Sequence, residues 1–168
     1  VSENNFLGKG VKLGLDLRIT EETIRGSFSV NNPNFNYSGK SLVTSLESTK
    51  IDRLSTNGYE STKMGFSLGT GFEQYENTYI RPRLSSYFED LTTNSDASAN
   101  LKKQSGNYFE TRFGYSLDND YRNQRFQTSE GHRLIFGQGI PLISDEYSLS
   151  NSLDMQKWFK INEDFITN

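Results

Sequence analysis

The chain has 168 residues, of which 18 are basic and 21 acidic, so its formal net charge is −3 at pH 7. This length fits one domain, and the near-balanced charge leaves no electrostatic footprint for nucleic acid. No stretch approaches the roughly 18 consecutive apolar residues of a membrane-spanning helix, and the first residues lack the zones of a secretory signal. The absence of cysteine excludes a disulfide framework and a thiolate metal site.

The composition is polar but rich in residues that favour strands. It includes 12 Phe, 9 Tyr and 14 Gly, with abundant Ser, Asn and Thr. So many aromatic residues argue against disorder. A polar chain with many aromatics results when half of every strand faces water, so the periodicity of the apolar residues decides the fold class.

Two alternating segments come first. From residue 11 to residue 19, every second residue is apolar and the residues between them are mostly charged. On a strand, this pattern makes one face aliphatic and the other charged. A second alternating run over 23–30 follows Glu21 and Glu22 and ends at the Asn-Asn-Pro of 31–33. The two runs predict an antiparallel hairpin.

The alternation continues, less regularly, to the end of the chain. Further strands are predicted over 40–52, 60–74, 78–91, 109–118, 131–142 and 146–161. No segment has a convincing 3.6-residue period, so no helix is predicted. The sequence therefore predicts an all-β, antiparallel fold of about eight strands.

The connections fall into two groups. Those near 20–23, 53–59, 92–106 and 143–145 lie at one end of the predicted strands, and those near 4–10, 33–39, 74–77 and 119–130 lie at the other. The longest connection of the first group is rich in Ser, Asn and Ala. Outer-membrane barrels have long external loops and short periplasmic turns, so the first group is predicted to be external.

Two architectures produce such strands: a transmembrane barrel, and a soluble sandwich or lipocalin-like barrel. A soluble sheet would expose mostly Lys and Glu on its polar face, whereas the polar face of a membrane barrel lines a lumen. The alternating polar positions here are Arg18, Arg25, Arg81, Arg83, Arg112 and Arg133 with Asp16, Glu47, Glu110 and Asp118. The aromatics near strand ends, suited to two interfacial girdles, are Phe35, Tyr37, Tyr59, Tyr75, Tyr79, Tyr87, Phe88, Tyr121 and Trp158. The pattern favours the membrane barrel.

The opposite positions are predicted to face lipid. They alternate with charged or small residues along each strand and are large and apolar. The residues chosen for this prediction are Leu13, Leu15, Leu17, Phe28, Phe66, Phe113 and Phe136.

Three turns carry distinctive motifs. The first includes Asn4, Asn5, Phe6, Leu7, Gly8 and Gly10, in an Asn-Asn-Phe-Leu-Gly-x-Gly run. The second includes Pro33 and Phe35, and the third includes Asp120, Arg122 and Gly131. These motifs resemble periplasmic turns of the BamA-type outer-membrane protein assembly factors, the bacterial surface antigen family. In the third motif, Asn123 stands where Asp is usual, and Thr128 with Ser129 stands where Pro-Thr is usual. The resemblance covers nearly the whole chain, although only the turns are specific.

The resemblance implies that residues 1–168 are part of an outer-membrane barrel, about strands three to ten of sixteen. Periplasmic repeat domains, the lid loop and the closing strands would then lie outside these residues. The family folds and inserts β-barrel proteins into the bacterial outer membrane by offering a membrane-embedded sheet edge to unpaired strands. Its implied partners are the lipid bilayer and unfolded outer-membrane clients, together with assembly-complex lipoproteins bound through the other domains. Ile24-Arg25-Gly26 superficially resembles the family's lid motif, but it falls within a strand.

The sequence contains few residues that could form a catalytic site. His132 is the only histidine, and a lipid-modifying esterase would have to pair it with Glu130 and Ser129. A polar residue beside a turn is the simpler interpretation, so no catalytic residue, metal or cofactor is predicted. Gly69 and Gly71, like Gly137 and Gly139, do not open a helix and are therefore not phosphate loops. The alternatives are a related translocation or secretion barrel, a complete eight-stranded barrel (an enzyme or an adhesin-like protein), and a soluble ligand-binding barrel.

Overall fold

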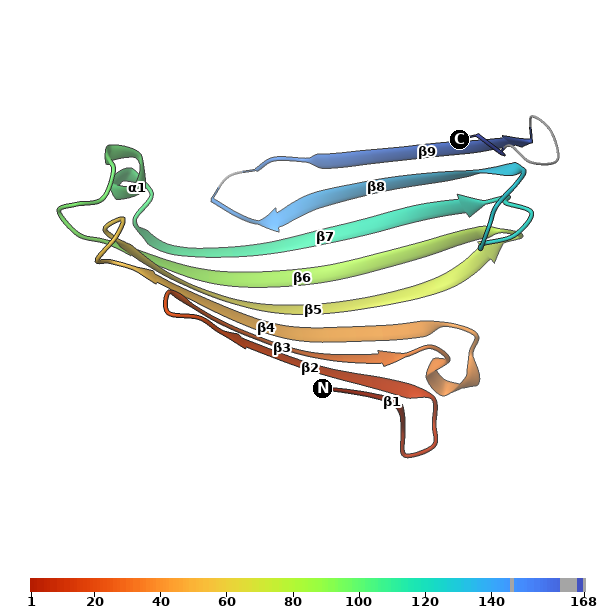
Figure 1. Cartoon of the computed structure of the whole chain (residues 1–168), viewed down its shortest axis with the longest axis horizontal. Coiled ribbons are helices and arrows are strands. Elements are labelled where there is room, and N and C mark those ends of the chain that lie inside the picture. Colours follow the sequence, from red (N-terminus) through yellow and green to blue (C-terminus); the bar gives the residue numbers. More distant parts are fainter. Residues whose placement is uncertain (146, 161–165, 168) are drawn as a thin grey trace.

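A computed structural model describes residues 1–145, 147–160 and 166–167. They form one antiparallel sheet in which the strands lie in chain order. The strands are β1 (Ser2–Phe6), β2 (Val11–Ile19), β3 (Thr23–Asn32), β4 (Ser41–Arg53), β5 (Tyr59–Tyr75), β6 (Thr78–Thr93), β7 (Gly106–Asp120), β8 (Gly131–Ile143), β9 (Ser150–Lys160) and β10 (Ile166–Thr167). Figure 1 shows them side by side, from β1 at one edge to β9 near the other.

The eight predicted strands correspond to β2 through β9, with boundaries within a few residues. The last one was predicted over 146–161, and both of these end residues lie outside the described residues. The prediction was wrong at Ser2–Phe6, where β1 replaces part of a turn. This strand has no apolar alternation because Glu3, Asn4 and Asn5 are consecutive polar residues, so only its pairing with β2 identifies it.

Two short helices also depart from the prediction of an all-strand chain. A single 3-10 turn, η1 (Phe35–Tyr37), lies between β3 and β4. Helix α1 (Ala99–Lys103) lies in the long connection between β6 and β7, where the Ser98 hydroxyl accepts a hydrogen bond from the N–H of Leu101. Five residues are too few for a 3.6-residue period to be recognised in the sequence.

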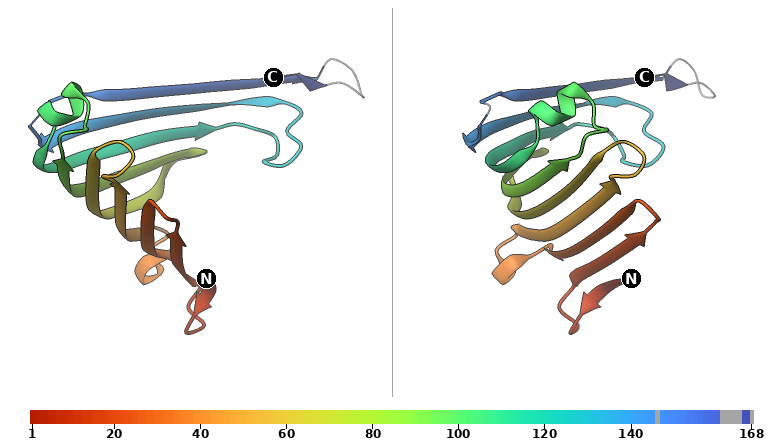
Figure 2. Two further views of the ribbon diagram at one scale, coloured as in Figure 1. Left: turned by 60° about the vertical axis from the view of Figure 1, so that its left-hand side comes forward. Right: turned by 90° about the vertical axis from the view of Figure 1, so that its left-hand side faces the viewer.

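The sheet is curved and is a single layer. Figure 2 shows the strands following an arc, with nothing stacked on either face. Among the described residues, Ala97 is the one hydrophobic residue that is buried. A soluble sandwich needs two layers packed around an apolar core, so this architecture is excluded.

The predicted grouping of connections is confirmed. In Figure 1, the connections 20–22, 54–58 and 94–105 lie at the left end of the sheet, as do the described residues 144–145 and 147–149, and the connections 7–10, 33–40, 76–77 and 121–130 lie at the right. These ends are called the loop end and the turn end. The described edges, β1 and β10, do not pair with each other, so the sheet is an open part of a barrel wall rather than a closed small barrel.

Candidate membrane-spanning surface and structured turns

Strand registers divide the side chains between two faces. Residues that are direct partners in antiparallel strands point to the same side of a sheet. One such row runs across seven strands: Leu13, Val30, Thr44, Leu68, Leu84, Phe113 and Ile140. All seven residues predicted to face lipid lie on this side, which is called the apolar face. All ten charged positions named for the lumen lie on the other side, the polar face.

Burial shows which face is concave. Asp118 is 2% exposed and Ser67 is 3% exposed, and both are on the polar face. Leu15 is 56% exposed and Phe66 is 43% exposed, on the apolar face. Side chains converge on the concave side of a curved sheet and separate on the convex side. The polar side chains therefore line the inside of the arc, and large apolar side chains cover its outside.

Ion pairs and hydrogen bonds connect the polar face. The Asp118 carboxylate accepts hydrogen bonds from Arg81 at 3.0 Å and from Arg133 at 2.8 and 2.9 Å. The Arg112 guanidinium donates to Glu110 at 2.6 and 2.9 Å. A carboxylate as buried as Asp118 is stable only with such partners. The Asp118 pairs join β6, β7 and β8 and so hold the wall together, whereas the Arg112–Glu110 pair lies within β7.

Glycines on the polar face make room for larger neighbours. Gly65 lies under the ring of Tyr87, and a Cβ at position 65 would be 2.6 Å from that ring. Gly139 lies under the Arg112 side chain, with 3.3 Å from a built Cβ to Cδ. Gly69 and Gly71 in β5 and Gly137 and Gly139 in β8 are strand-interior residues, as predicted.

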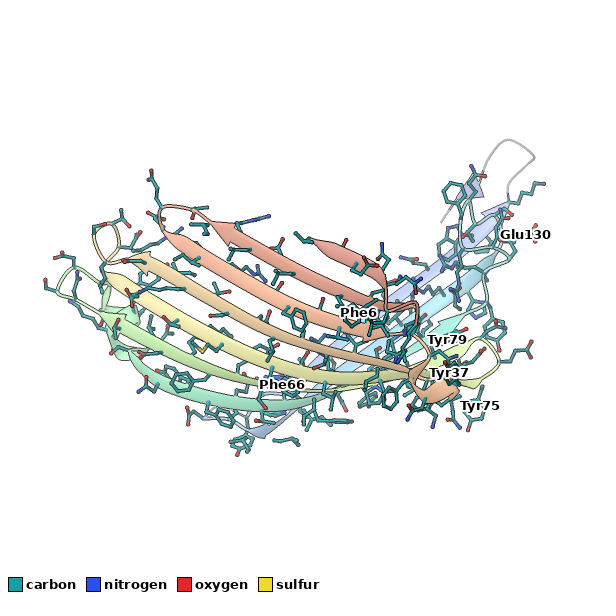
Figure 3. All side chains as sticks on the ribbon, turned by 90° about the horizontal axis from the view of Figure 1, so that it is seen from below. Phe6, Tyr37, Phe66, Tyr75, Tyr79 and Glu130 are labelled. Carbon is teal, nitrogen blue, oxygen red and sulfur yellow. The ribbon has the colours of Figure 1, made fainter. Side chains whose placement is uncertain are left out.

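The predicted aromatic girdle is only partly on the apolar face. Figure 3 shows Phe6, Tyr37, Tyr75 and Tyr79 gathered at the turn end, with Phe66 midway along the sheet. However, the registers place Tyr59, Tyr79, Tyr87 and Trp158 on the polar face. The sequence prediction failed for these four because proximity to a strand end does not fix the side to which a residue points.

The first two motif turns are held by asparagine side chains. The Asn5 Oδ1 accepts from the N–H of Gly10 at 2.7 Å, and the Asn34 Oδ1 accepts from the N–H of Gly39 at 2.8 Å. Leu7 has a φ of 54°, and Gly8 and Gly10 also have positive φ values. Asn4, Asn5 and Phe6 belong to the end of β1, whereas Pro33 and Phe35 lie within the connection after β3.

The third motif turn, 121–130, is fixed at its base. Arg122 donates to both Asp120 oxygens at 2.7 Å, and its guanidinium lies 5.6 Å from the Trp158 ring centre. The bidentate hydrogen bonds from Arg122 to Asp120 raise the pKa of Arg122. Gly131 has a φ of 110°, and a Cβ there would be 2.2 Å from the carbonyl oxygen of Tyr121.

Asn123 organises the rest of that turn. Its Oδ1 accepts from the backbone N–H groups of Gln124, Ser129 and Glu130 at 3.0 to 3.3 Å, and its Nδ2 donates to the Ser129 hydroxyl at 2.7 Å. An amide can donate as well as accept, which an aspartate cannot. The turn is therefore well bonded despite its departure from the usual motif, because these hydrogen bonds form only between residues that folding brings together.

The described residues contain no assembled catalytic or metal site. The His132 ring stacks on Tyr121, with 5.3 Å between ring centres, and no hydrogen bond joins it to Glu130 or Ser129. Figure 3 shows Glu130 at the turn end. No group of three or more His, Cys, Asp and Glu residues within the described ranges is arranged to hold a metal ion. Within those ranges, no helix is long and apolar enough to cross a membrane.

Comparisons with known proteins agree with this geometry. The model of the Omp85 superfamily domain matches residues 5–167. The crystal structure of BamA from Haemophilus ducreyi lacking POTRA domains 1–3 superposes with a TM-score of 0.73 at 18% sequence identity. The match covers 97% of this chain and 34% of that chain, so the chain spans about a third of the BamA structure. A search of curated proteins finds no match.

Proposed function

The chain belongs to the Omp85 superfamily, and from this premise we propose that it is part of a BamA-type barrel that folds and inserts β-barrel proteins. Barrels of this superfamily lie in the bacterial outer membrane and assemble or translocate proteins without catalysing a bond change. The apolar face, including Leu15, Phe66 and Phe113, is the side that meets lipid. The polar face lines the lumen.

By analogy with the family, β2 to β9 are about strands three to ten of sixteen, and periplasmic repeat domains, a lid loop and closing strands complete the protein. Unfolded outer-membrane proteins are the clients, and assembly-complex lipoproteins bind the other domains. The three turns containing Asn5, Pro33 and Arg122 are the periplasmic ones.

The mechanism follows from the energetics of backbone groups in lipid. Each unpaired N–H or C=O costs several kcal/mol in the hydrocarbon region, so a strand entering alone meets a large barrier. A membrane-embedded sheet edge lowers this barrier by pairing with the entering strand. In this scheme, the chain described here supplies a continuous wall that holds the barrel open and curved.

The observation that carries the proposal is the superfamily match across nearly the whole of an open, single-layer sheet with one apolar face. The test is controlled depletion of the natural full-length protein in its source bacterium, followed by quantitative proteomics of the outer membrane. If the protein is an assembly factor, its depletion should lower the abundance of most β-barrel proteins. The abundance of lipoproteins in the same membrane should stay unchanged.

The same experiment distinguishes an assembly factor from a translocation or secretion barrel. Loss of one exported protein, with normal amounts of other outer-membrane barrels, would contradict the assembly role. Complementation by the natural gene controls for indirect effects of depletion. The variant Arg122→Ala, expressed in the same cells, tests whether the structured turn is required for the assembly of β-barrel proteins.

A further inference from the structure

We propose that the apolar face carries a binding site for one acyl chain of a membrane lipid, in a hollow lined by residues of β2 to β7. The hollow has a volume of about 560 Å³. Its walls are the side chains of Leu15, Phe28, Leu46, Met64, Phe66 and Phe88. This inference requires that the apolar face lie in lipid, but it does not depend on the assembly role.

The hollow arises from small residues in an otherwise bulky surface. The row formed by Leu15, Phe28, Leu46 and Phe66 is continuous over four strands. In the neighbouring row, Gly26 pairs directly with Ser48, so two adjacent strands lack a large side chain there. Large side chains therefore surround a depression whose floor is formed by Gly26, Ser48 and Ser86.

The floor on β6 presents no free hydroxyl. The Ser86 hydroxyl lies 2.9 Å from the Thr111 hydroxyl, and the two form a hydrogen bond on the apolar face. Because an unpaired polar group is costly in hydrocarbon, this pairing suits a surface that contacts methylene groups. An apolar ligand therefore displaces no water from Ser86, whereas the exposed Ser48 hydroxyl is not bonded to another described residue.

The hollow extends from the loop-end limit of the apolar face toward the middle of that face, where Leu15 lies. One row nearer the loop end, the apolar face carries Lys50, Thr62, Asp90 and Asn107, and Lys50 pairs with Glu60 at 3.2 Å. On β4 to β7 this polar row ends the apolar surface, whereas the same row carries Ile24 on β3 and Ile19 on β2. The hollow opens directly beside it, where the first methylenes of a lipid in the loop-end leaflet lie.

The size of the hollow favours a lipid chain over a protein partner. Pockets for small ligands are typically about 300 to 1,000 Å³, whereas a stable protein interface covers about 800 Å² on each partner. The hollow is local, and the rows around it are bulky and convex. A narrow, flexible, saturated acyl chain can fill such a local hollow, which a flat protein surface cannot do.

The first experiment fills the hollow. The double variant Gly26→Leu/Ser48→Leu keeps the face apolar, and a Cβ at Gly26 meets only Leu17 Cδ1, at 3.9 Å. Val30→Leu is the matched control, on the same strand and face but outside the hollow. The full-length protein is purified from dimyristoyl phosphatidylcholine vesicles, washed with detergent and weighed by native mass spectrometry. Retained lipid should fall about tenfold in the double variant and stay unchanged in the control.

The second experiment does not use the double variant, so it remains informative if that variant fails to fold. Tryptophan is placed in the hollow by Phe66→Trp or outside it, on the same face, by Leu84→Trp. Brominated phosphatidylcholine is then titrated into vesicles of the unbrominated lipid. Quenching at position 66 should be half complete at a lower mole fraction of brominated lipid than at position 84.

Equal quenching at the two positions, with equal lipid retention, would mean an ordinary lipid annulus and would overturn the site. No quenching at either position would overturn the premise that this face lies in lipid. No client protein is present in either assay, so these failures are distinct from failure of the assembly role.

Discussion

Single residues determine the conformation of the turn between β7 and β8. Gly131 combines a positive φ with a backbone oxygen where its Cβ would be, so any side chain must move the turn. Gly131→Ala should destabilise the full-length barrel by about 1 to 3 kcal/mol. Urea titration in lipid vesicles, read by heat-modifiable gel mobility, measures this. Gly26 has an ordinary φ, and a Cβ there would make no close contact, so Gly26→Ala should leave the urea midpoint of unfolding unchanged. Equal shifts of the midpoint in the two variants would contradict the role given to the φ of Gly131.

Asn123 acts through its amide rather than through charge. Asn123→Ala leaves three exposed backbone N–H groups of the turn without their protein acceptor, at about 0.5 to 1.5 kcal/mol for a typical hydrogen bond. Asn123→Asp keeps the acceptor and loses only the donor to Ser129. Limited proteolysis should therefore cut the turn faster in Asn123→Ala than in Asn123→Asp. The opposite order would show that the side chain does not hold the turn.

At the scale of elements, substitutions at neighbouring residues of β2 should have different costs, because the residues lie on opposite faces. Leu15 lies on the apolar face and Asp16 on the polar face. Leu15→Arg should cost about 2 to 4 kcal/mol near the bilayer midplane, whereas Asp16→Arg should cost much less. Spin labels at the two positions give an independent measurement. Only the label at 15 should be shielded from water-soluble relaxants, and equal accessibility would contradict the assignment of faces.

The strands were predictable because alternation is a local property. Leu13, Leu15 and Leu17 identify β2 and its apolar face without any knowledge of its neighbours. By contrast, β1 is defined only by its register with β2, and Tyr79 and Trp158 needed a register to be placed on a face. The turn motifs located the right segments, but the acceptor role of Asn123 depends on residues that only folding brings together. The hollow is a property of several strands, so one strand's sequence cannot show it.

At the scale of the whole molecule, the open edges predict that these 168 residues are not autonomous. The described edges, β1 and β10, leave backbone groups unpaired, which costs several kcal/mol for each group in hydrocarbon. Closing the sheet on itself would crowd Arg81, Arg83 and Tyr87 in a narrow lumen. The isolated chain should therefore fail to insert as a stable monomer and should aggregate in water.

Refolding the isolated chain into detergent micelles and bilayers tests this. Its heat-modifiable mobility and protease resistance are compared with those of the natural full-length barrel. A compact, protease-resistant monomer would show that the chain forms a complete small barrel and that the open sheet is not its membrane state.

The order of the strands has a kinetic consequence. Because every strand pairs with its neighbour in the chain, each new pairing closes a loop no longer than one hairpin connection. The entropy of loop closure grows with the length of the closed loop, and fast folding accompanies contacts that are local in sequence. The sheet can therefore grow from a first nucleus by the addition of one hairpin at a time. Each hairpin that joins leaves a fresh edge as the template for the next.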